Sequence, residues 1–237
     1  YGTAVTWDYY KNVHGRNGIA NNGVGAYNRV HYSRRYNNAF WSDSCFCMTY
    51  GDGNVFKTLT ALDVAGHEMT HGVTERTANL TYAKESGALN ESWSDIMGSM
   101  VELYADGGNM TTNTWLIGED IYTPNTAGDA LRRMDNPNAV GDPDHYSLRL
   151  YPGTCTASNA NDQCGVHTNS SISNHAYYLI TAGGTNRVSG VTVPGIGASA
   201  AERIFYRALT VYMTASTNFA GARTATLNAA TDLFGAS

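Results

Sequence analysis

The chain has 237 residues, 42% of them hydrophobic, and a formal net charge of −5. This length and apolar content suffice for one large domain or two small ones with a buried core, which excludes a disordered tail. Only 15% of the residues are charged and no basic run occurs, so the sequence carries no electrostatic footprint for nucleic acid or for an anionic membrane surface.

The first 60 residues predict strands and turns. They are rich in Gly, Asn, Tyr and Ser, and apolar runs such as AVTWDYY and RVHYS are broken by GRNG and NNG. This pattern is typical of short strands, with room for one short helix. The N-terminal stretch lacks the charged start and apolar core of a signal peptide, and no apolar stretch approaches the roughly 20 residues that cross a bilayer. If the protein is secreted, we expect its signal peptide to have been removed already.

Helical spacing begins near residue 60. Apolar residues recur three and four positions apart, which indicates an amphipathic helix: Leu62, Ala65, Met69 and Val73. A second helix is predicted from about Gly87 to Tyr104. The connection after it, NPNAVGDPDHYSLRLYPG, fits no regular template because it is rich in Gly, Asn, Asp and Pro.

Three more helices are predicted, at about residues 170–182, 199–213 and 218–233. We find no internal repeat and no low-complexity linker. The predicted organisation is a β-rich N-terminal part, residues 1–60, followed by a catalytic and mainly helical region, residues 61–237.

Four cysteines occur as two close pairs, Cys45 with Cys47 and Cys155 with Cys164. Four cysteines allow three connectivities, and neither pair has the C-x-x-C spacing of metal chemistry. Cys155 and Cys164 bracket the polar segment TASNANDQ, which favours a disulfide closing that loop, whereas a bond between Cys45 and Cys47 closes a strained small ring. Bonds to residues outside the chain and free core thiols are the alternatives. The cysteines and the polar composition favour an extracellular setting.

The segment VAGHEMTHGV, residues 64–73, places two histidines four residues apart with a glutamate beside the first. On a helix, His67 and His71 present their rings to a common point, and Glu68 points about a hundred degrees round the axis. A catalytic zinc ion needs three protein ligands and one open position. A lone helix with two histidines is more often structural, so a third ligand decides between the two interpretations.

The segment ESGALNESWSD supplies that third ligand. Glu91 follows His71 by twenty residues on the second predicted helix, and Asp95 lies one turn further along the same face. Asp95 can accept the second imidazole N–H of a ligand histidine and so fix the orientation of its ring. Glu91 by itself would be a solvated helix carboxylate; combined with the histidine motif, it is predicted to bind zinc.

VAGHEMTHGVTERTANLTYAKESGALNESWSD resembles the zinc core of the thermolysin-like neutral zinc metalloendopeptidases. Further blocks resemble that family, in the family's order, over almost the whole chain: KNVHGRNG, VHYSRRYNNAFW, MTYGDG, IGEDIYTP, LRRMDNP, GDPDHYS, GVHTNS and IFYRALTVYMT. The resemblance implies an α+β, thermolysin-like fold, with a β-rich N-terminal part, a mainly α-helical C-terminal part, and the zinc site in the cleft between them.

The resemblance also implies the catalytic roles. His67, His71 and Glu91 would bind one catalytic Zn²⁺, and Glu68 would be the general base that takes a proton from the zinc-bound water. This agrees with the chemistry of the residues, since zinc lowers the pKa of its water towards about 7 and a nearby carboxylate completes the nucleophile.

The tetrahedral intermediate would be stabilised by two further side chains. His167 in GVHTNS would donate a hydrogen bond to the oxyanion, Asp162 would orient that histidine, and Tyr82 in NLTYAKES would be the second donor. Without the resemblance, Tyr82 and His167 would be ordinary surface side chains. The segment around Cys155 and Cys164 is longer than in thermolysin and lies just before Asp162 and His167, so a disulfide there would stiffen this side of the site.

The implied substrate contacts follow in the same way. Asn38 and Ala39 resemble the edge strand that pairs with an extended peptide. Arg132 would bind the substrate carbonyl beyond the scissile bond. An apolar pocket for the side chain after that bond would be lined by Phe56, Leu59, Val64, Ile117, Ile121 and Leu131. Ordinary core packing is the alternative for these residues, and a preference for bulky hydrophobic side chains is the expected specificity.

One or two structural Ca²⁺ ions are also implied. The carboxylates that resemble the family's buried calcium site are Asp63, Glu102, Glu119 and Asp120. Thr114 and Leu116 stand where thermolysin carries acids, so this site is expected to hold one ion rather than two. A second, separate loop site would use Tyr122, Thr123, Thr126 and Asp129, with solvated loop residues as the alternative.

Family members usually begin further upstream and finish with a further helix after the block that resembles ATDLFG, so we expect a fragment or a shortened form. The predicted function is that of a secreted, monomeric zinc endopeptidase acting on protein and peptide substrates. The alternative is a zinc-bearing but catalytically inactive peptide-binding scaffold, which would need none of the acid, base and oxyanion groups. A serine acyl-transfer enzyme ranks last because no G-x-S-x-G motif is present.

Overall fold

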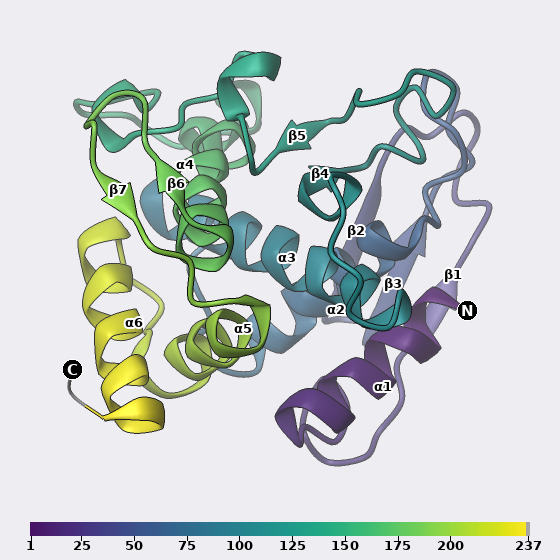
Figure 1. The fold of residues 1–237 in the computed structure, drawn as a ribbon. Coiled ribbons are helices and arrows are strands. Elements are labelled where there is room, and N and C mark those ends of the chain that lie inside the picture. Colours follow the sequence, from purple (N-terminus) through teal and green to yellow (C-terminus); the bar gives the residue numbers. More distant parts are fainter. Residues whose placement is uncertain (236–237) are drawn as a thin grey trace. The chain divides into compact units, whose positions relative to one another are not determined.

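The computed structural model describes residues 1–235 (Figure 1). They form two compact units that alternate along the chain. Unit 1 comprises residues 1–76 and 94–132, and unit 2 comprises residues 77–93 and those from 133 onward. One long helix, α3 (Lys84–Ala105), contributes residues to both units. The domain boundary that the sequence predicts near residue 60 stays a prediction.

The described residues form six α-helices and seven short strands, with irregular connections between them. The helices are α1 (Gly2–His14), α2 (Leu62–Glu75), α3 (Lys84–Ala105), α4 (Asp162–Ala182), α5 (Ala198–Arg207) and α6 (Phe219–Phe234). The strands are β1 (Tyr27–Arg29), β2 (Ala39–Ser42), β3 (Cys47–Tyr50), β4 (Leu116–Ile117), β5 (Arg132–Arg133), β6 (Gly184–Thr185) and β7 (Thr192–Val193).

Helix α1 corrects the prediction for the first residues. The run AVTWDYY, interpreted as a strand, lies inside this helix. Its buried residues Thr6, Tyr9 and Tyr10 have the three- and four-residue spacing of one helix face, which a run so rich in β-branched and aromatic residues conceals. The Tyr10 hydroxyl lies 2.7 Å from Thr70 Oγ1, so this face packs on α2.

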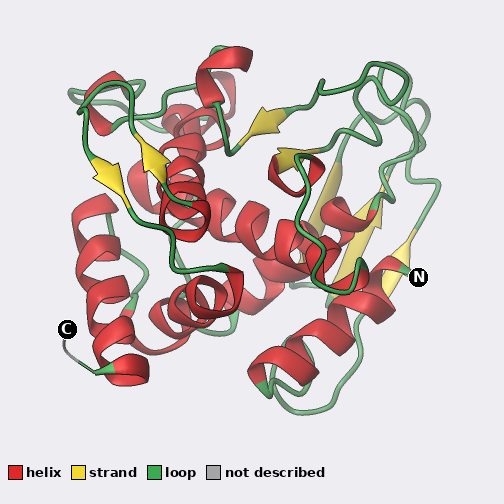
Figure 2. Ribbon diagram, viewed as in Figure 1, coloured by secondary structure: helices red, strands yellow, loops and turns green. Residues whose placement is uncertain are grey.

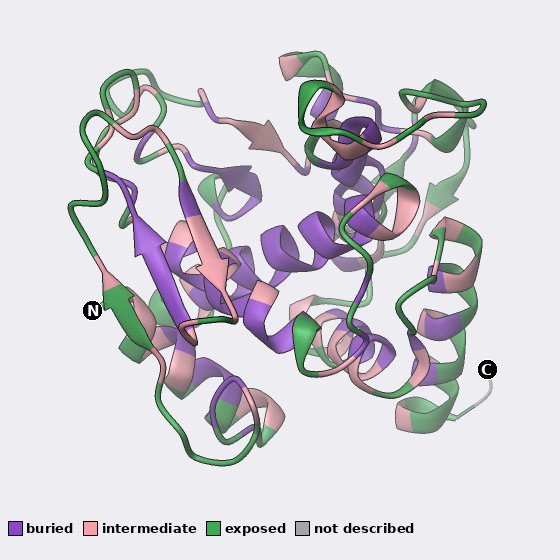
Figure 3. Cartoon of the chain, turned by 180° about the vertical axis from the view of Figure 1, so that it is seen from behind, coloured by how far each residue is buried: buried purple, intermediate pink, exposed green. Residues whose placement is uncertain are grey.

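The sheet of unit 1 has the strand order β1-β3-β2. Strand β3 is central and wholly buried; it pairs in parallel with β1 and antiparallel with β2, from Ala39 opposite Tyr50 to Ser42 opposite Cys47 (Figures 2 and 3). Among the described strands, β2 therefore has a neighbour on one side only. Helix α2 contacts β2 and β3, and the apolar core of unit 1 lies between the helix and the sheet.

Two glycines bring α2 and α3 together in unit 1. A Cβ atom on Gly66 would lie 2.9 Å from the Cα atom of Gly98, and a Cβ atom on Gly98 would lie 2.7 Å from the carbonyl oxygen of Asp63. Such distances leave no room for a side chain. Residues 87–101 of α3 are buried (Figure 3), so the polar residues of this stretch face protein rather than solvent.

Unit 2 is mainly helical, as the sequence predicts (Figure 2). The three predicted helices correspond to α4, α5 and α6, with two differences. Helix α4 begins earlier, at Asp162, and contains non-helical backbone at residues 163–165. Helix α5 ends at Arg207 and continues as a π-helical turn, Ala208–Tyr212. Among the described residues, no helix is both long enough and apolar enough to cross a membrane.

All four cysteines are paired in the structure, Cys45 with Cys47 and Cys155 with Cys164. The favoured pairing of Cys155 with Cys164 is therefore present, and the interpretation of the cysteines as free thiols is not supported. The segment NPNAVGDPDHYSLRLYPG, residues 136–153, is irregular as predicted, with only single turns of 3₁₀ helix at Pro137–Val140 and Tyr146–Leu148.

Candidate active site

The two histidines of α2 face each other across one helical turn. The Nε2 atoms of His67 and His71 lie 2.9 Å apart. The other ring nitrogen of His67 is 2.9 Å from Asp95 Oδ1, and that of His71 is 3.2 Å from Ser94 Oγ. In tetrahedral zinc coordination, two imidazole nitrogens are separated by about 3.3 Å, so this arrangement fits two ligands of one metal ion.

Asp95 joins His67 to Arg132 within unit 1. Its carboxylate is fully buried and accepts hydrogen bonds from Arg132 Nε and Nη2, both at 2.7 Å. Burial alone would raise the pKa of Asp95, but the charge of Arg132 and the hydrogen bond from His67 hold it well below its usual range. Asp95 therefore stays ionised and fixes the ring of His67, as expected of a partner to a metal ligand.

Glu68 lies on α2 between the histidines and is buried, with 6% of its surface exposed. Burial, and then the negative charge of Glu68, raise the pKa of the nearby Tyr50 above its ordinary value. Tyr50 is therefore a neutral phenol facing a carboxylate. A carboxylate in such a low-dielectric position is suited to proton transfer.

In unit 2, four predicted site residues lie together: the three catalytic residues Tyr82, Asp162 and His167, and the zinc ligand Glu91. The Tyr82 hydroxyl donates a hydrogen bond to Glu91 Oε1 and lies 3.3 Å from His167 Nε2. His167 Nε2 is 3.5 Å from Glu91 Oε1. Asp162 Oδ1 lies 2.6 Å from His167 Nδ1 and so orients its ring. Glu91 is buried, whereas Tyr82 and His167 are half exposed.

The predicted substrate residues of unit 1 also lie in one region. Ala39 begins the edge strand β2, and the carbonyl oxygen of the preceding Asn38 accepts a hydrogen bond from Gly51 at 3.1 Å. Five of the six predicted pocket residues belong to the apolar cluster under the sheet: Phe56, Leu59, Val64, Ile121 and Leu131. The sixth, Ile117, is buried in β4. Their packing fits either a pocket or ordinary core, so their role stays a prediction.

Carboxylates gather where α3 passes the turn after β4. Ligand oxygens of Glu102, Glu119 and Asp120 lie within 4.8 Å of one another. Burial and the neighbouring carboxylates, Asp63 first among them, raise the pKa of Glu102 to about 9 and that of Glu119 to about 8. Glu119 Oε2 is buried without a hydrogen-bond partner among the described residues. Such a group of hard oxygen ligands fits a divalent cation such as calcium.

The second predicted calcium segment forms a turn. The Thr123 hydroxyl donates to Asp129 Oδ2 at 2.5 Å, and the Thr126 amide donates to the Thr123 carbonyl at 2.8 Å. Tyr122 is partly exposed. A metal role for this segment stays a prediction.

Ser94 is a contact of His71 that the sequence did not predict. It supplies the hydroxyl beside His71 Nδ1 and lies three residues after Glu91, at helical spacing. That spacing in ESWSD was the available signal, but serine is too common in helices for the signal to stand out.

Comparison with known proteins defines the family. Residues 1–75 match the thermolysin metallopeptidase catalytic domain, and residues 78–237 match the thermolysin metallopeptidase alpha-helical domain. The chain belongs to the thermolysin metallopeptidase family. The resemblance that the motifs carry is thereby confirmed.

The individual relatives agree. The chain is 52% identical over 232 residues to bacillolysin of Brevibacillus brevis, and 50% identical over 236 residues to thermolysin of Alicyclobacillus acidocaldarius subsp. acidocaldarius. These matches cover 98% and 99% of this chain but 41% of each relative, so the chain spans about two fifths of their length.

Among solved structures, the chain is similar to the precursor of protealysin, a metalloproteinase from Serratia proteamaculans. The TM-score is 0.79 at 30% identity, covering 99% of this chain and 71% of that one. The thermolysin-like α+β fold predicted from the sequence is therefore confirmed.

Proposed function

We propose that this chain carries the active site of a zinc-dependent endopeptidase, with His67, His71 and Glu91 as the zinc ligands. The observation that carries the proposal is the pair of imidazole Nε2 atoms 2.9 Å apart. The Nδ1 atom of each ring contacts a side chain of α3, Asp95 or Ser94. Glu91 is proposed as the third ligand because it precedes Asp95 by one turn of α3, and Asp95 contacts His67. Family membership supports the same set.

The remaining residues are proposed to move or stabilise charge. Zinc, when bound, lowers the pKa of a water molecule to about 7 and polarises the substrate carbonyl. Glu68 takes the proton from the attacking water and passes it to the leaving amine. His167, oriented by Asp162, and Tyr82 donate hydrogen bonds to the oxyanion that develops on the carbonyl.

Substrate binding is proposed to use the edge strand β2. An extended peptide beside Asn38 and Ala39 adds a strand through main-chain hydrogen bonds, which tolerates many sequences. Arg132, held in place by Asp95, is proposed to meet the carbonyl after the scissile bond. The apolar cluster beneath the sheet supports a preference for bulky hydrophobic side chains at that position.

A structural calcium ion is proposed at Asp63, Glu102, Glu119 and Asp120. Four carboxylates in one partly buried group repel one another unless a cation is bound; burial first, and then this repulsion, raises the pKa of Glu102 and of Glu119. We further propose that the protein is secreted and monomeric. The two disulfides support secretion, since such bonds persist in oxidising compartments.

The test is hydrolysis of an internally quenched peptide with a bulky apolar residue after the scissile bond. We expect hydrolysis to stop on chelation and to return with zinc. Glu68→Gln should lower kcat by about 10²–10⁴-fold, because the general base is lost while the zinc ligands remain. Glu75→Gln is the matched control: it is the same substitution on the same helix, at a residue that contacts Trp41.

An inactive peptide-binding scaffold predicts a different result. One equivalent of zinc would bind, the peptide would bind, and neither the parent protein nor the variants would cleave it. That outcome would refute the endopeptidase. The grouping of Tyr82, Glu91, Asp162 and His167 in unit 2 supports the enzyme, because a binder needs no oxyanion donors.

A further inference from the structure

Asp162 fixes both the ring and the backbone of His167. Its Oδ1 atom is 2.6 Å from His167 Nδ1, and its Oδ2 atom accepts a hydrogen bond from the His167 amide at 2.9 Å. The His167 side chain is half exposed, with 49% of its surface accessible, so core packing does not fix its orientation. The position of His167 Nε2 therefore depends on where Asp162 is held.

Asp162 begins a run of left-handed backbone. Residues Asp162, Gln163, Cys164 and Gly165 have φ angles of 52°, 51°, 72° and 75°. Only glycine adopts this conformation without a steric penalty, because a Cβ atom approaches the following carbonyl oxygen. Three consecutive non-glycine residues persist in this conformation only if the surrounding structure restrains them.

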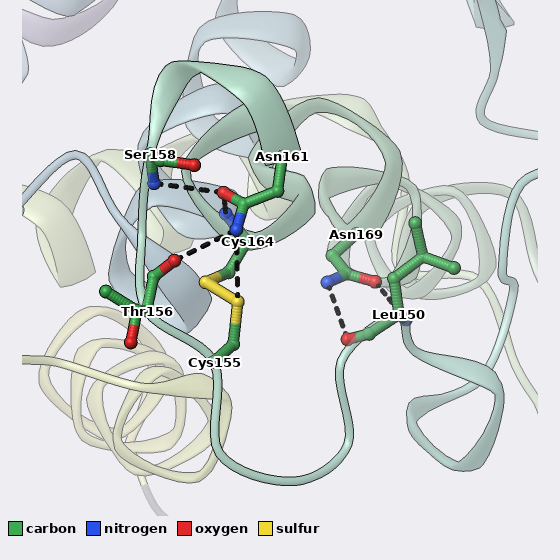
Figure 4. The surroundings of a disulfide bond; sticks show 7 residues. All are labelled: Leu150, Cys155, Thr156, Ser158, Asn161, Cys164 and Asn169. Carbon is green, nitrogen blue, oxygen red and sulfur yellow. Dashed lines mark hydrogen bonds between the residues drawn. A yellow bond between two sulfur atoms is a disulfide. The ribbon is translucent and has the colours of Figure 1, made fainter.

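A disulfide and one amide side chain supply that restraint (Figure 4). Cys164, in the middle of the run, is bonded to Cys155. Asn161 Oδ1 accepts hydrogen bonds from the amides of Ser158 and Cys164, at 3.0 and 3.1 Å. Asn161 Nδ2 donates to the carbonyl oxygen of Thr156 at 2.9 Å. Both ends of the Asn161 amide are thus used to hold the loop to the start of α4.

The loop is tied to α4 at its other end as well. Asn169, two residues after His167 on α4, accepts a hydrogen bond from the Leu150 amide at 2.8 Å and donates one to the Leu150 carbonyl at 3.2 Å (Figure 4). Cys164 is buried, with 2% of its surface exposed. The segment 151–161 is therefore anchored at its start by the Leu150–Asn169 hydrogen bonds, and towards Asp162 by the disulfide and Asn161.

We propose that Asn161 and the Cys155–Cys164 disulfide position the oxyanion donor His167 by holding Asp162. The inference rests on the proposed function, in which His167 acts in the reaction. It adds to that function a loop, residues 151–161, that does not contact the substrate but affects kcat through Asp162 and His167. His167 Nε2, 3.3 Å from the Tyr82 hydroxyl, is the atom whose placement depends on the loop.

Three variants test the proposal. Asn161→Ala removes all contacts of the amide, and Asn161→Asp keeps the acceptor for the two backbone amides but loses the donor. The double variant Cys155→Ala/Cys164→Ala removes the disulfide without leaving a free thiol. The control is Cys45→Ala/Cys47→Ala, which removes the disulfide of unit 1, whose closed loop contains a single residue between the cysteines.

The measurements are kcat and KM on the quenched peptide, and inhibition by two zinc-directed peptides. A peptide phosphonamidate carries tetrahedral oxygens like those of the transition state, whereas a peptide thiol binds the metal without them. We expect Asn161→Ala and the Cys155–Cys164 variant to lower kcat and phosphonamidate affinity about tenfold, with KM and thiol affinity unchanged. Asn161→Asp should recover part of the loss, and the control should match the parent.

Equal weakening of both inhibitors, or an unchanged kcat in folded Asn161→Ala, would overturn the proposal while leaving the endopeptidase intact. A parent protein that neither cleaves the peptide nor binds the thiol would instead refute the proposed function, and this inference with it. Thermal unfolding confirms that each variant is folded at the assay temperature. If the double cysteine variant is unfolded at that temperature, kcat and inhibitor affinity of Asn161→Ala alone test the proposal.

Discussion

Removal of the proposed calcium ion should destabilise the protein in a way that depends on pH. In the ion-free protein the pKa of Glu102 is raised to about 9, mainly by burial and by Asp63. In the unfolded chain Glu102 ionises near 4.5. The folded state therefore binds more protons than the unfolded state between these values, so the stability of the ion-free protein falls as pH rises through this interval.

The magnitude follows from the same values. At pH 7, Glu102 contributes a loss of about 3 kcal/mol relative to pH 4.5 or below, since each pKa unit corresponds to about 1.4 kcal/mol. Glu119 is more exposed than Glu102, so solvent screens its charge more and its contribution to the loss of stability is smaller. For a chain of this size, about 3 kcal/mol lowers the unfolding midpoint by roughly 6–12 °C. Bound calcium opposes the loss, by about 2.7 kcal/mol at one hundred times its Kd.

The assay is calorimetric unfolding at pH 5 and pH 7, with and without a calcium-selective chelator, at a fixed free zinc concentration. We expect a small calcium-dependent shift of the midpoint at pH 5 and a shift of several degrees at pH 7. Glu102→Gln, which mimics the protonated acid, should remove most of the pH dependence. Equal shifts at both pH values, or no shift at either, would refute the assignment of the cation site to these carboxylates.

Two further predictions concern α3. Asp95→Asn removes the charge that faces His67 and Arg132 and should weaken zinc binding about 10–100-fold. Competition with a chromophoric chelator measures the zinc affinity. An unchanged affinity would mean that the orientation of His67 does not need this carboxylate. Gly98→Ala places a methyl group 2.7 Å from a carbonyl oxygen of α2 and should cost about 1–3 kcal/mol in denaturant unfolding, whereas Gly25→Ala, where the added atom meets nothing within 4 Å, should cost far less.

Much of the site was predictable because its signals are local. The spacing of His67 and His71 places both rings on one face of any helix, and Glu91 and Asp95 have the same relation on the next helix. Motifs of this kind depend on helix geometry alone, so they can be recognised without knowledge of the fold. The same locality explains why α2 and α3 were predicted within a few residues of their bounds.

Features that depend on distant partners, or on an unusual backbone conformation, were not readable in this way. The burial of Tyr9 and Tyr10 that makes α1 a helix comes from packing on α2, which strand-favouring residues conceal in the sequence. Asn161 is one polar residue among many in its loop. Its function as an anchor appears only when the left-handed backbone at Cys164 is seen.

The sequence by itself determined the family, the helix that carries the histidine motif and the identity of the acids beside it, since each follows from residue spacing along a single element. Only the tertiary structure decided that Asp95 is shared between His67, 28 residues away, and Arg132, 37 residues away. The sequence also favoured the disulfide before His167, but only the tertiary structure decided that the side chain of Asn161 restrains the same segment. The physical reason is that the contacts of Asp95 are set by the packing of distant segments, and that the left-handed backbone held by Asn161 is not specified by the local pattern of the chain.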